Sequence, residues 1–208
     1  MRLSQLLTVS SVLASLALAL PAHAEDAQGF IQSEHRKLDQ LLHQPPSPAR
    51  DSEVNAALDG FVDYDELARR AFGEPCPTSI PSCEDLWAGY SDAQKTELRD
   101  LLKQLVEKNY RKNLTKTLDY DVSYKGSKGA GGDTRVLTEA KSKTNPREEP
   151  YRVDYVVKQT PSGYRVVDII TEGSVLTKDY YEQFLKKQHN EGYDAIVSKL
   201  REKIAKKD

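Results

Sequence analysis

The stretch GYRVVDIITEGSVLTKDYYEQF, residues 163–184, predicts a strand, a sharp turn at a glycine and then a helix. The strand is apolar on both faces apart from Asp168, which is typical of a strand that is buried on both sides or faces an apolar cavity. Gly173 ends the strand because glycine tolerates backbone angles that other residues do not. From Thr177, aromatic residues recur at helical spacing. A two-sided apolar strand leading into an aromatic-rich helix indicates a pocket with a hydrophobic wall and a polar mouth.

Three further strands are expected before this one. Apolar and polar residues alternate over residues 118–125, 134–140 and 151–158, which is typical of strands with one covered face. The Gly-rich segment 126–132 predicts the turn between the first two strands. Because the links between consecutive strands are short, we expect an antiparallel meander.

Helical periodicity flanks these strands on both sides. Upstream, the pattern predicts helices over residues 27–42 and 52–58, a third helix capped by Asp63, and a long helix from Ser91. Downstream, it predicts a helix over residues 177–190 and another near the C-terminus. The expected fold class is therefore α+β: a single domain in which helices cover an antiparallel sheet of about four strands, with an apolar cavity between sheet and helices.

Residues 1–24 are predicted to be a cleaved signal peptide. A single Arg precedes an apolar run over residues 6–20, and Ala22-His23-Ala24 fits the small-x-small cleavage pattern. Residues 25–208 would then form one mature domain located in the periplasm. The chain of 208 residues has 30 Lys and Arg against 32 Asp and Glu, a balance that does not suggest a nucleic-acid partner.

Cys76 and Cys83 are the only cysteines of the chain. Two cysteines that bracket a short, proline-containing loop in an oxidising compartment are expected to form a disulfide. A metal site is the alternative, but two ligands are too few to build one. We therefore expect the Cys76–Cys83 disulfide and no metal.

The chain shows no motif that commits it to catalysis. The loop KGSKGAGGD, residues 125–133, lacks the Gly-Lys-Ser/Thr ending of a phosphate-binding loop. No serine nucleophile elbow and no His-Glu-x-x-His motif occurs. Asp168, with Asp154 or a tyrosine, leaves open an acid–base pair like that of small cone-shaped α+β isomerases. The commoner role of such a carboxylate is structural, with Arg165, Arg135 or backbone donors as partners.

The closing stretch resembles the MlaC, or toluene-tolerance, family of periplasmic lipid carriers. In that family a strand ending in an aspartate and a Glu-Gly pair precedes a short apolar run, an Asn-Tyr-Arg and a Gln-x-x-Phe-like helix. The matching residues here are Val167, Asp168, Glu172, Gly173, Leu176, Tyr180, Gln183 and Phe184. Asp179 and Tyr181 stand where the family pattern has Asn and Arg. Upstream, FVDYDELARRAFG at residues 61–73 resembles the family's early helix.

The resemblance implies a carrier that shields phospholipid acyl chains and shuttles lipid between outer-membrane and inner-membrane complexes, so that the outer membrane keeps its lipid asymmetry. It also implies two partners: an inner-membrane ABC lipid transporter, to which the protein would be auxiliary, and an outer-membrane lipoprotein complex. A carrier needs no cofactor and no catalytic group, so we expect neither enzymatic activity nor a cofactor. We expect a monomer.

The expected pocket wall has two parts. One is the strand face that bears Val153, Tyr155 and Val157, the most regular apolar strand face in the chain. The other part comes from neighbouring helices and strands. The complete set of predicted lipid-binding residues is Val106, Tyr110, Val136, Val153, Tyr155, Val157, Val175, Leu176, Tyr180 and Phe184.

Two other functional classes stay open on the sequence alone. One is a small α+β enzyme of isomerase type centred on Asp168. The other is a lipid-free module whose tyrosines dock a protein. The chain has 11 tyrosines against one tryptophan and four phenylalanines, and amphipathic rings of this kind suit both the rim of a cavity and a protein interface.

Overall fold

The computed structural model describes residues 26–77 and 79–206, so the predicted signal peptide lies outside the described residues. Short helices come first and one long helix follows them, with a short 3-10 turn, η1, in between. Their bounds are α1 Ala27–Leu42, α2 Pro48–Phe61, α3 Tyr64–Ala71, η1 Trp87–Gly89 and α4 Asp92–Thr117. The strands and the last two helices are β1 Tyr120–Ala130, β2 Asp133–Ser142, β3 Tyr151–Thr160, β4 Gly163–Thr171, β5 Ser174–Val175, α5 Leu176–Glu191 and α6 Tyr193–Ala205.

Several helices begin at side chains that accept hydrogen bonds from free backbone N–H groups. The Asp63 carboxylate accepts from the Glu66 N–H at 2.9 Å and starts α3. Before α4, the Ser91 N–H donates to the Gln94 side chain at 2.9 Å, while the Ser91 hydroxyl accepts from the Gln94 N–H. Ser91 and Gln94 therefore form a capping box at the start of α4, and the long helix expected from Ser91 is confirmed.

The strands form one antiparallel sheet in the order β1-β2-β3-β4-β5. The predicted meander is confirmed, with the two-residue β5 added to the four expected strands. The expected turn over residues 126–132 is too long, because β1 continues to Ala130. Gly126 has a φ of +100° and lies where the pairing register shifts, so the strand passes through a bulge there instead of ending.

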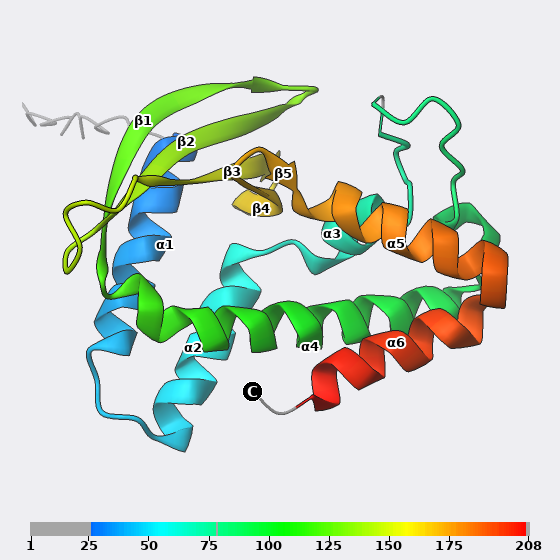
Figure 1. Cartoon of the computed structure of the whole chain (residues 1–208), viewed down its shortest axis with the longest axis horizontal. Coiled ribbons are helices and arrows are strands. Elements are labelled where there is room, and N and C mark those ends of the chain that lie inside the picture. Colours follow the sequence, from blue (N-terminus) through cyan, green and yellow to red (C-terminus); the bar gives the residue numbers. More distant parts are fainter. Residues whose placement is uncertain (1–25, 78, 207–208) are drawn as a thin grey trace, which may run out of the picture.

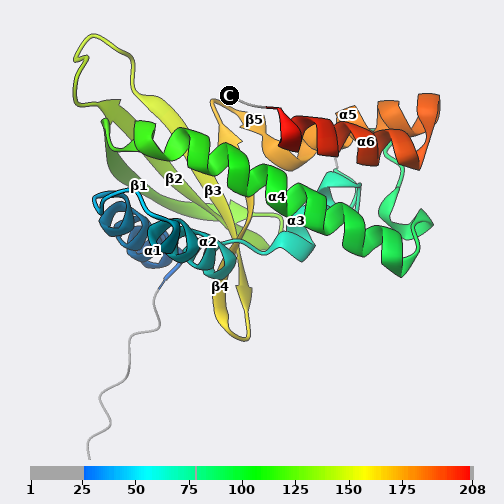
Figure 2. The same cartoon turned by 90° about the horizontal axis from the view of Figure 1, so that it is seen from below.

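The helices lie in two groups around this sheet. Figures 1 and 2 show α1 and α2 across one face of the sheet, with α4 on the same side. Beyond the end of the sheet, α3, α5 and α6 pack with the N-terminal part of α4. The expected α+β class with helices over a sheet is thus the observed one, and α4 joins the two groups.

One continuous apolar core runs through both groups. Phe72, at the end of α3, stacks on Phe184 of α5 with ring centroids 4.6 Å apart and also contacts Trp87 and Tyr90. A second, smaller cluster of Val156, Val167, Ile170 and Val175 is separate from this core. Among the described residues, no helix is long and apolar enough to span a membrane.

Candidate functional site

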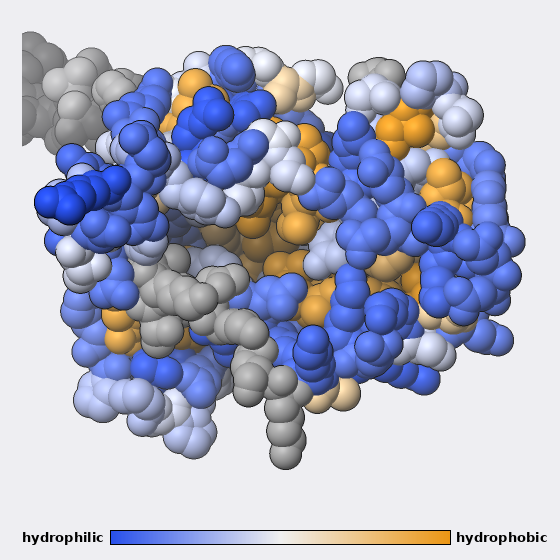
Figure 3. All heavy atoms as spheres, viewed as in Figure 1, coloured by the Kyte–Doolittle hydropathy of each residue, from blue (hydrophilic) through white to orange (hydrophobic). Residues whose placement is uncertain are grey.

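A pocket opens where α4, the β4–β5 turn and the start of α5 meet. Its volume is about 250 Å³. Figure 3 draws the side of the molecule seen in Figure 1, and it shows apolar side chains at the bottom of a hollow between α4 and the sheet. The lining residues are Val106, Asn109, Tyr110, Ile169, Thr171, Ser174, Leu176, Asp179 and Tyr180.

The aliphatic side chains of the lining are half-buried, whereas most of its polar side chains are exposed and form a rim. Val106, Ile169 and Leu176 bring aliphatic side chains from the three elements. Asn109 and Asp179, with the hydroxyls of Thr171 and Ser174, add polar groups. A pocket of this kind can hold an apolar chain inside while a polar group stays at the mouth.

Asp168 fixes the start of α5 beside this pocket. Its carboxylate accepts hydrogen bonds from the Thr177 N–H at 3.1 Å, the Thr177 hydroxyl at 2.5 Å and the Ile169 N–H at 2.9 Å. Burial raises the pKa of Asp168, although these donors act against the shift. Two of the three donors are backbone N–H groups, as expected, and the third is a hydroxyl, whereas Arg135 and Arg165 donate to other acceptors. Asp168 thus ties β4 to the first turn of α5.

The second carboxylate of the imagined acid–base pair has partners of its own. Asp154 accepts from the Arg135 side chain, with Nε at 2.8 Å, and from the Thr138 N–H at 3.0 Å. Each of the two carboxylates is therefore held by its own set of donors. Within residues 26–77 and 79–206, no group of three or more His, Cys, Asp or Glu side chains is placed to hold a metal ion.

Tyr110 lines the pocket, and Tyr155 is the cross-strand partner of Ile169 in the lining. Both residues are half-buried. Burial raises the pKa of both hydroxyls. Behind Tyr155 lies His35, whose ring is 5.0 Å away edge-on and whose Nδ1 is 2.8 Å from the Tyr124 hydroxyl.

The structure brings part of the predicted set together at this pocket. Val106, Tyr110, Leu176 and Tyr180 line it. Two more predicted residues are cross-strand neighbours of its lining: Val153 pairs with Thr171, and Tyr155 pairs with Ile169.

The remaining predicted residues lie elsewhere. Val136 and Val157 are fully buried in the packed core. Phe184 stacks on Phe72, and Val175 belongs to the smaller cluster. The sequence prediction omitted Ile169, Asn109, Thr171, Ser174 and Asp179. Of these, Ile169 carried a signal, because it lies in the strand whose two faces are both apolar.

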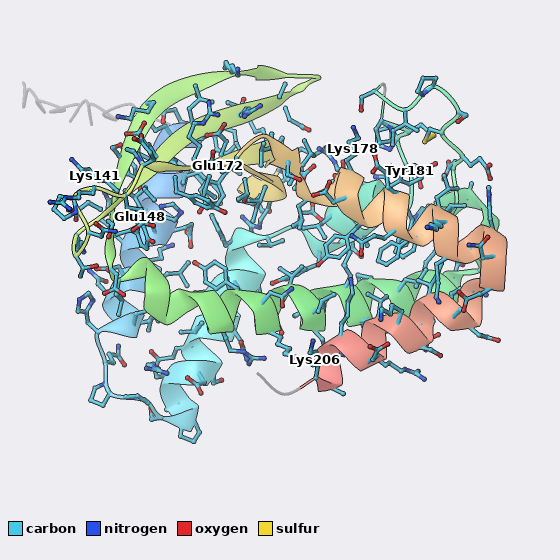
Figure 4. All side chains as sticks on the ribbon, in the orientation of Figure 1. Lys141, Glu148, Glu172, Lys178, Tyr181 and Lys206 are labelled. Carbon is cyan, nitrogen blue, oxygen red and sulfur yellow. A yellow bond between two sulfur atoms is a disulfide. The ribbon has the colours of Figure 1, made fainter. Side chains whose placement is uncertain are left out.

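The predicted disulfide between Cys76 and Cys83 is present. Its loop is fastened to α5 through Tyr181, whose hydroxyl accepts from the Glu84 N–H at 2.7 Å and donates to the Glu84 carbonyl at 3.1 Å. Figure 4 shows Lys178 on the edge of α5 that points away from α4. The loop and Lys178 therefore lie outside the pocket lining.

The chain matches one protein family and is similar in fold to a solved structure. The family described as "MlaC protein" matches residues 36–202. Among solved structures, a phospholipid-binding protein from Ralstonia solanacearum, in complex with a phospholipid, is similar in fold with a TM-score of 0.69. It is 22% identical in sequence, and the match covers 86% of this chain and 97% of that one. No curated protein matches this chain.

Proposed function

Because the chain belongs to the MlaC family, we propose that it is a lipid carrier that holds acyl chains in the pocket between α4, β4 and α5. The observation that supports this most directly is the division of the lining into half-buried aliphatic side chains and a mostly exposed polar rim. A lipid crosses an aqueous gap only if its chains are shielded, and each buried methylene contributes about 0.8 kcal/mol. Such shielding requires no catalytic group.

The acyl chains would extend beyond the space that is open in this structure. The pocket volume of about 250 Å³ is below the roughly 300–1,000 Å³ of ordinary ligand sites. We place the inner wall at Tyr110, which lines the pocket, and at Val153 and Tyr155, which pair with lining residues of β4. In this arrangement chains entering at Leu176 separate α4 from the sheet, and Val136 and Val157 form the layer behind the wall.

The cargo that we propose is a phospholipid. The similar protein from Ralstonia solanacearum was solved with a phospholipid, which supports this class of cargo. We further propose that residues 1–24 direct export to the periplasm. There the carrier would exchange lipid between an inner-membrane ABC transporter and an outer-membrane lipoprotein complex, and so help to keep the outer membrane asymmetric.

Mass spectrometry of organic extracts tests the carrier function. Protein purified gently from cells should contain phospholipid near one molecule per chain, because removing the acyl chains from the pocket exposes them to water. The same extraction of a secreted protein without a pocket is the control. A protein that contains no lipid, and takes none up from vesicles, would contradict the proposal and favour the protein-docking alternative.

A further inference from the structure

The described lining of the pocket carries a negative charge. Among the described side chains that line the pocket, Asp179 is the only one with a formal charge. It lies in the first turn of α5 and is exposed. The Ser174 hydroxyl donates a hydrogen bond to its carboxylate. This contact holds the carboxylate across the β5–α5 junction, at the rim, where a lipid headgroup would sit.

Among the described side chains, the basic groups near the mouth are engaged with other partners. Lys178 lies 3.8 Å from the Glu182 carboxylate and points away from α4. Lys203 lies 5.9 Å from the centroid of the Tyr180 ring and donates to the Gln183 side chain at 3.0 Å. It belongs to the groove between α5 and α6 rather than to this pocket.

Lys108 is also turned away, because its ammonium donates to the backbone carbonyls of Lys203 and Lys206 at the end of α6. The other nearby carboxylate, Glu172, accepts from the Arg152 N–H. Asp179 is therefore the charge that a headgroup meets first among the described side chains.

On the premise of the proposed carrier function, we propose that the pocket prefers phospholipids whose headgroup carries an amine over phospholipids with a net negative headgroup. The ammonium of an ethanolamine lipid can pair with the Asp179 carboxylate and with the neighbouring hydroxyls of Thr171 and Ser174. The headgroup of phosphatidylglycerol has no positive group. It brings only its negative phosphate close to the Asp179 carboxylate. Exposed pairs of this kind are weak, so the preference is about two- to fivefold.

The experiment measures headgroup preference as a ratio. Delipidated protein is incubated with vesicles that contain equal amounts of phosphatidylethanolamine and phosphatidylglycerol with identical acyl chains, and the bound lipid is extracted and quantified. Wild-type protein should be enriched about two- to fivefold in the ethanolamine lipid. In Asp179→Asn the ratio should fall to that of the vesicles, and in Asp179→Lys it should reverse.

Glu191→Gln provides the matched control. It removes one negative charge from the same helix, 12 residues further on, which is about 18 Å away at 1.5 Å per residue. This variant should keep the wild-type ratio. At 1 M salt the electrostatic screening length is about 3 Å. The wild-type ratio should then be close to that of the vesicles.

The outcomes separate this preference from the carrier function. Wild-type protein that binds both lipids in the vesicle ratio overturns the preference and leaves the carrier function standing. The same holds if Asp179→Asn remains enriched in the ethanolamine lipid. Protein that takes up neither lipid overturns the carrier function, and the preference with it.

Discussion

At the scale of single residues, His35 occupies the most unusual environment. It lies between Phe61 and Tyr155, and its Nδ1 is 2.8 Å from the Tyr124 hydroxyl. Burial lowers the pKa of this imidazole from 6.5 to about 4. The ring is therefore neutral in the folded protein at neutral pH, and it packs as an aromatic side chain with one polar contact.

This depressed pKa predicts a loss of stability in acid. As the pH falls below 6.5 the unfolded chain binds a proton at His35 that the folded protein does not take up until about pH 4. The free energy of unfolding should therefore drop by about 3 kcal/mol over this range on account of His35 alone. In His35→Gln that part of the drop should be absent. Urea unfolding at several pH values between 7 and 4 measures this drop. The control is His43→Gln, at an exposed site, in which the free energy of unfolding should depend on pH as it does in wild type. Equal slopes in wild type and His35→Gln would contradict the assignment.

Asp168 shows how one buried carboxylate positions an element. Asp168→Asn should destabilise the protein by about 1–3 kcal/mol, because the amide replaces one of the two carboxyl oxygens that accept hydrogen bonds from Thr177 and the backbone. Burial raises the pKa of Asp168 in the fold. The stabilising effect of the protonated form is therefore present at low pH and lost as the pH rises through the folded pKa. The cost of the substitution should accordingly be larger at pH 4 than at pH 7, as measured by thermal unfolding. A cost that increases with pH would show that ion pairing, not burial, dominates at this site.

At the scale of elements, the end of α3 meets the disulfide loop and α5 at one point. Gly73 follows α3 with a φ of +87°. A Cβ atom there would lie 2.5 Å from the Glu84 carbonyl oxygen and 2.8 Å from Cε2 of Tyr181. The close approach of the Glu84 backbone and the Tyr181 side chain requires glycine at this position, and Tyr181 is fully buried.

Gly73→Ala is therefore expected to cost more than an ordinary glycine replacement. The positive φ alone costs about 1–2 kcal/mol, and the clash adds about 1–3 kcal/mol. Gly131→Ala is the matched control, because its φ is +59° and no atom lies within 4 Å of the added Cβ. Urea unfolding should show a larger loss for Gly73→Ala than for Gly131→Ala. Similar losses of stability in the two variants would show that the loop around Glu84 shifts to make room for the added methyl group.

Sequence patterns located the elements well and their ends less well. The helix over residues 27–42 and the cap at Asp63 follow from local chemistry, namely apolar spacing and a side chain that accepts from the first turn. The extension of β1 beyond Gly126 could not be predicted, because a glycine with positive φ serves a bulge as well as a turn. The pairing with β2 decides between the two, and the residues around Gly126 do not show by themselves that this pairing continues to Ala130.

At the scale of the whole molecule, the pocket exists because α4 and the sheet are held apart. The closest packing of α4 is with α3 and α6 rather than with a strand. Alternation in β3 correctly predicts which face is apolar. It gives no information on whether the facing side chains interlock, as at Val157, or leave a hollow, as near Ile169. That distinction depends on the distance between elements, which a single strand does not encode.

A bulky side chain in this hollow should block lipid without unfolding the protein. Val106 lies on α4, lines the pocket and is only partly buried, so Val106→Trp can fill open space instead of straining a packed core. The lipid recovered per chain should fall severalfold, while the melting temperature should stay within a few degrees of wild type. A fully packed site would lose about 1–3 kcal/mol on such overpacking.

Val122→Trp supplies the same substitution at a site on β1 that is 39% exposed, and it should retain both lipid and stability. Ile169→Trp places the ring on the opposite wall, so the test still stands if Val106→Trp fails to fold. Lipid loading is measured by extraction after incubation with vesicles. If both pocket variants fold and carry as much lipid as Val122→Trp, the acyl chains do not pass between α4 and β4, and the cargo must be bound at a different surface.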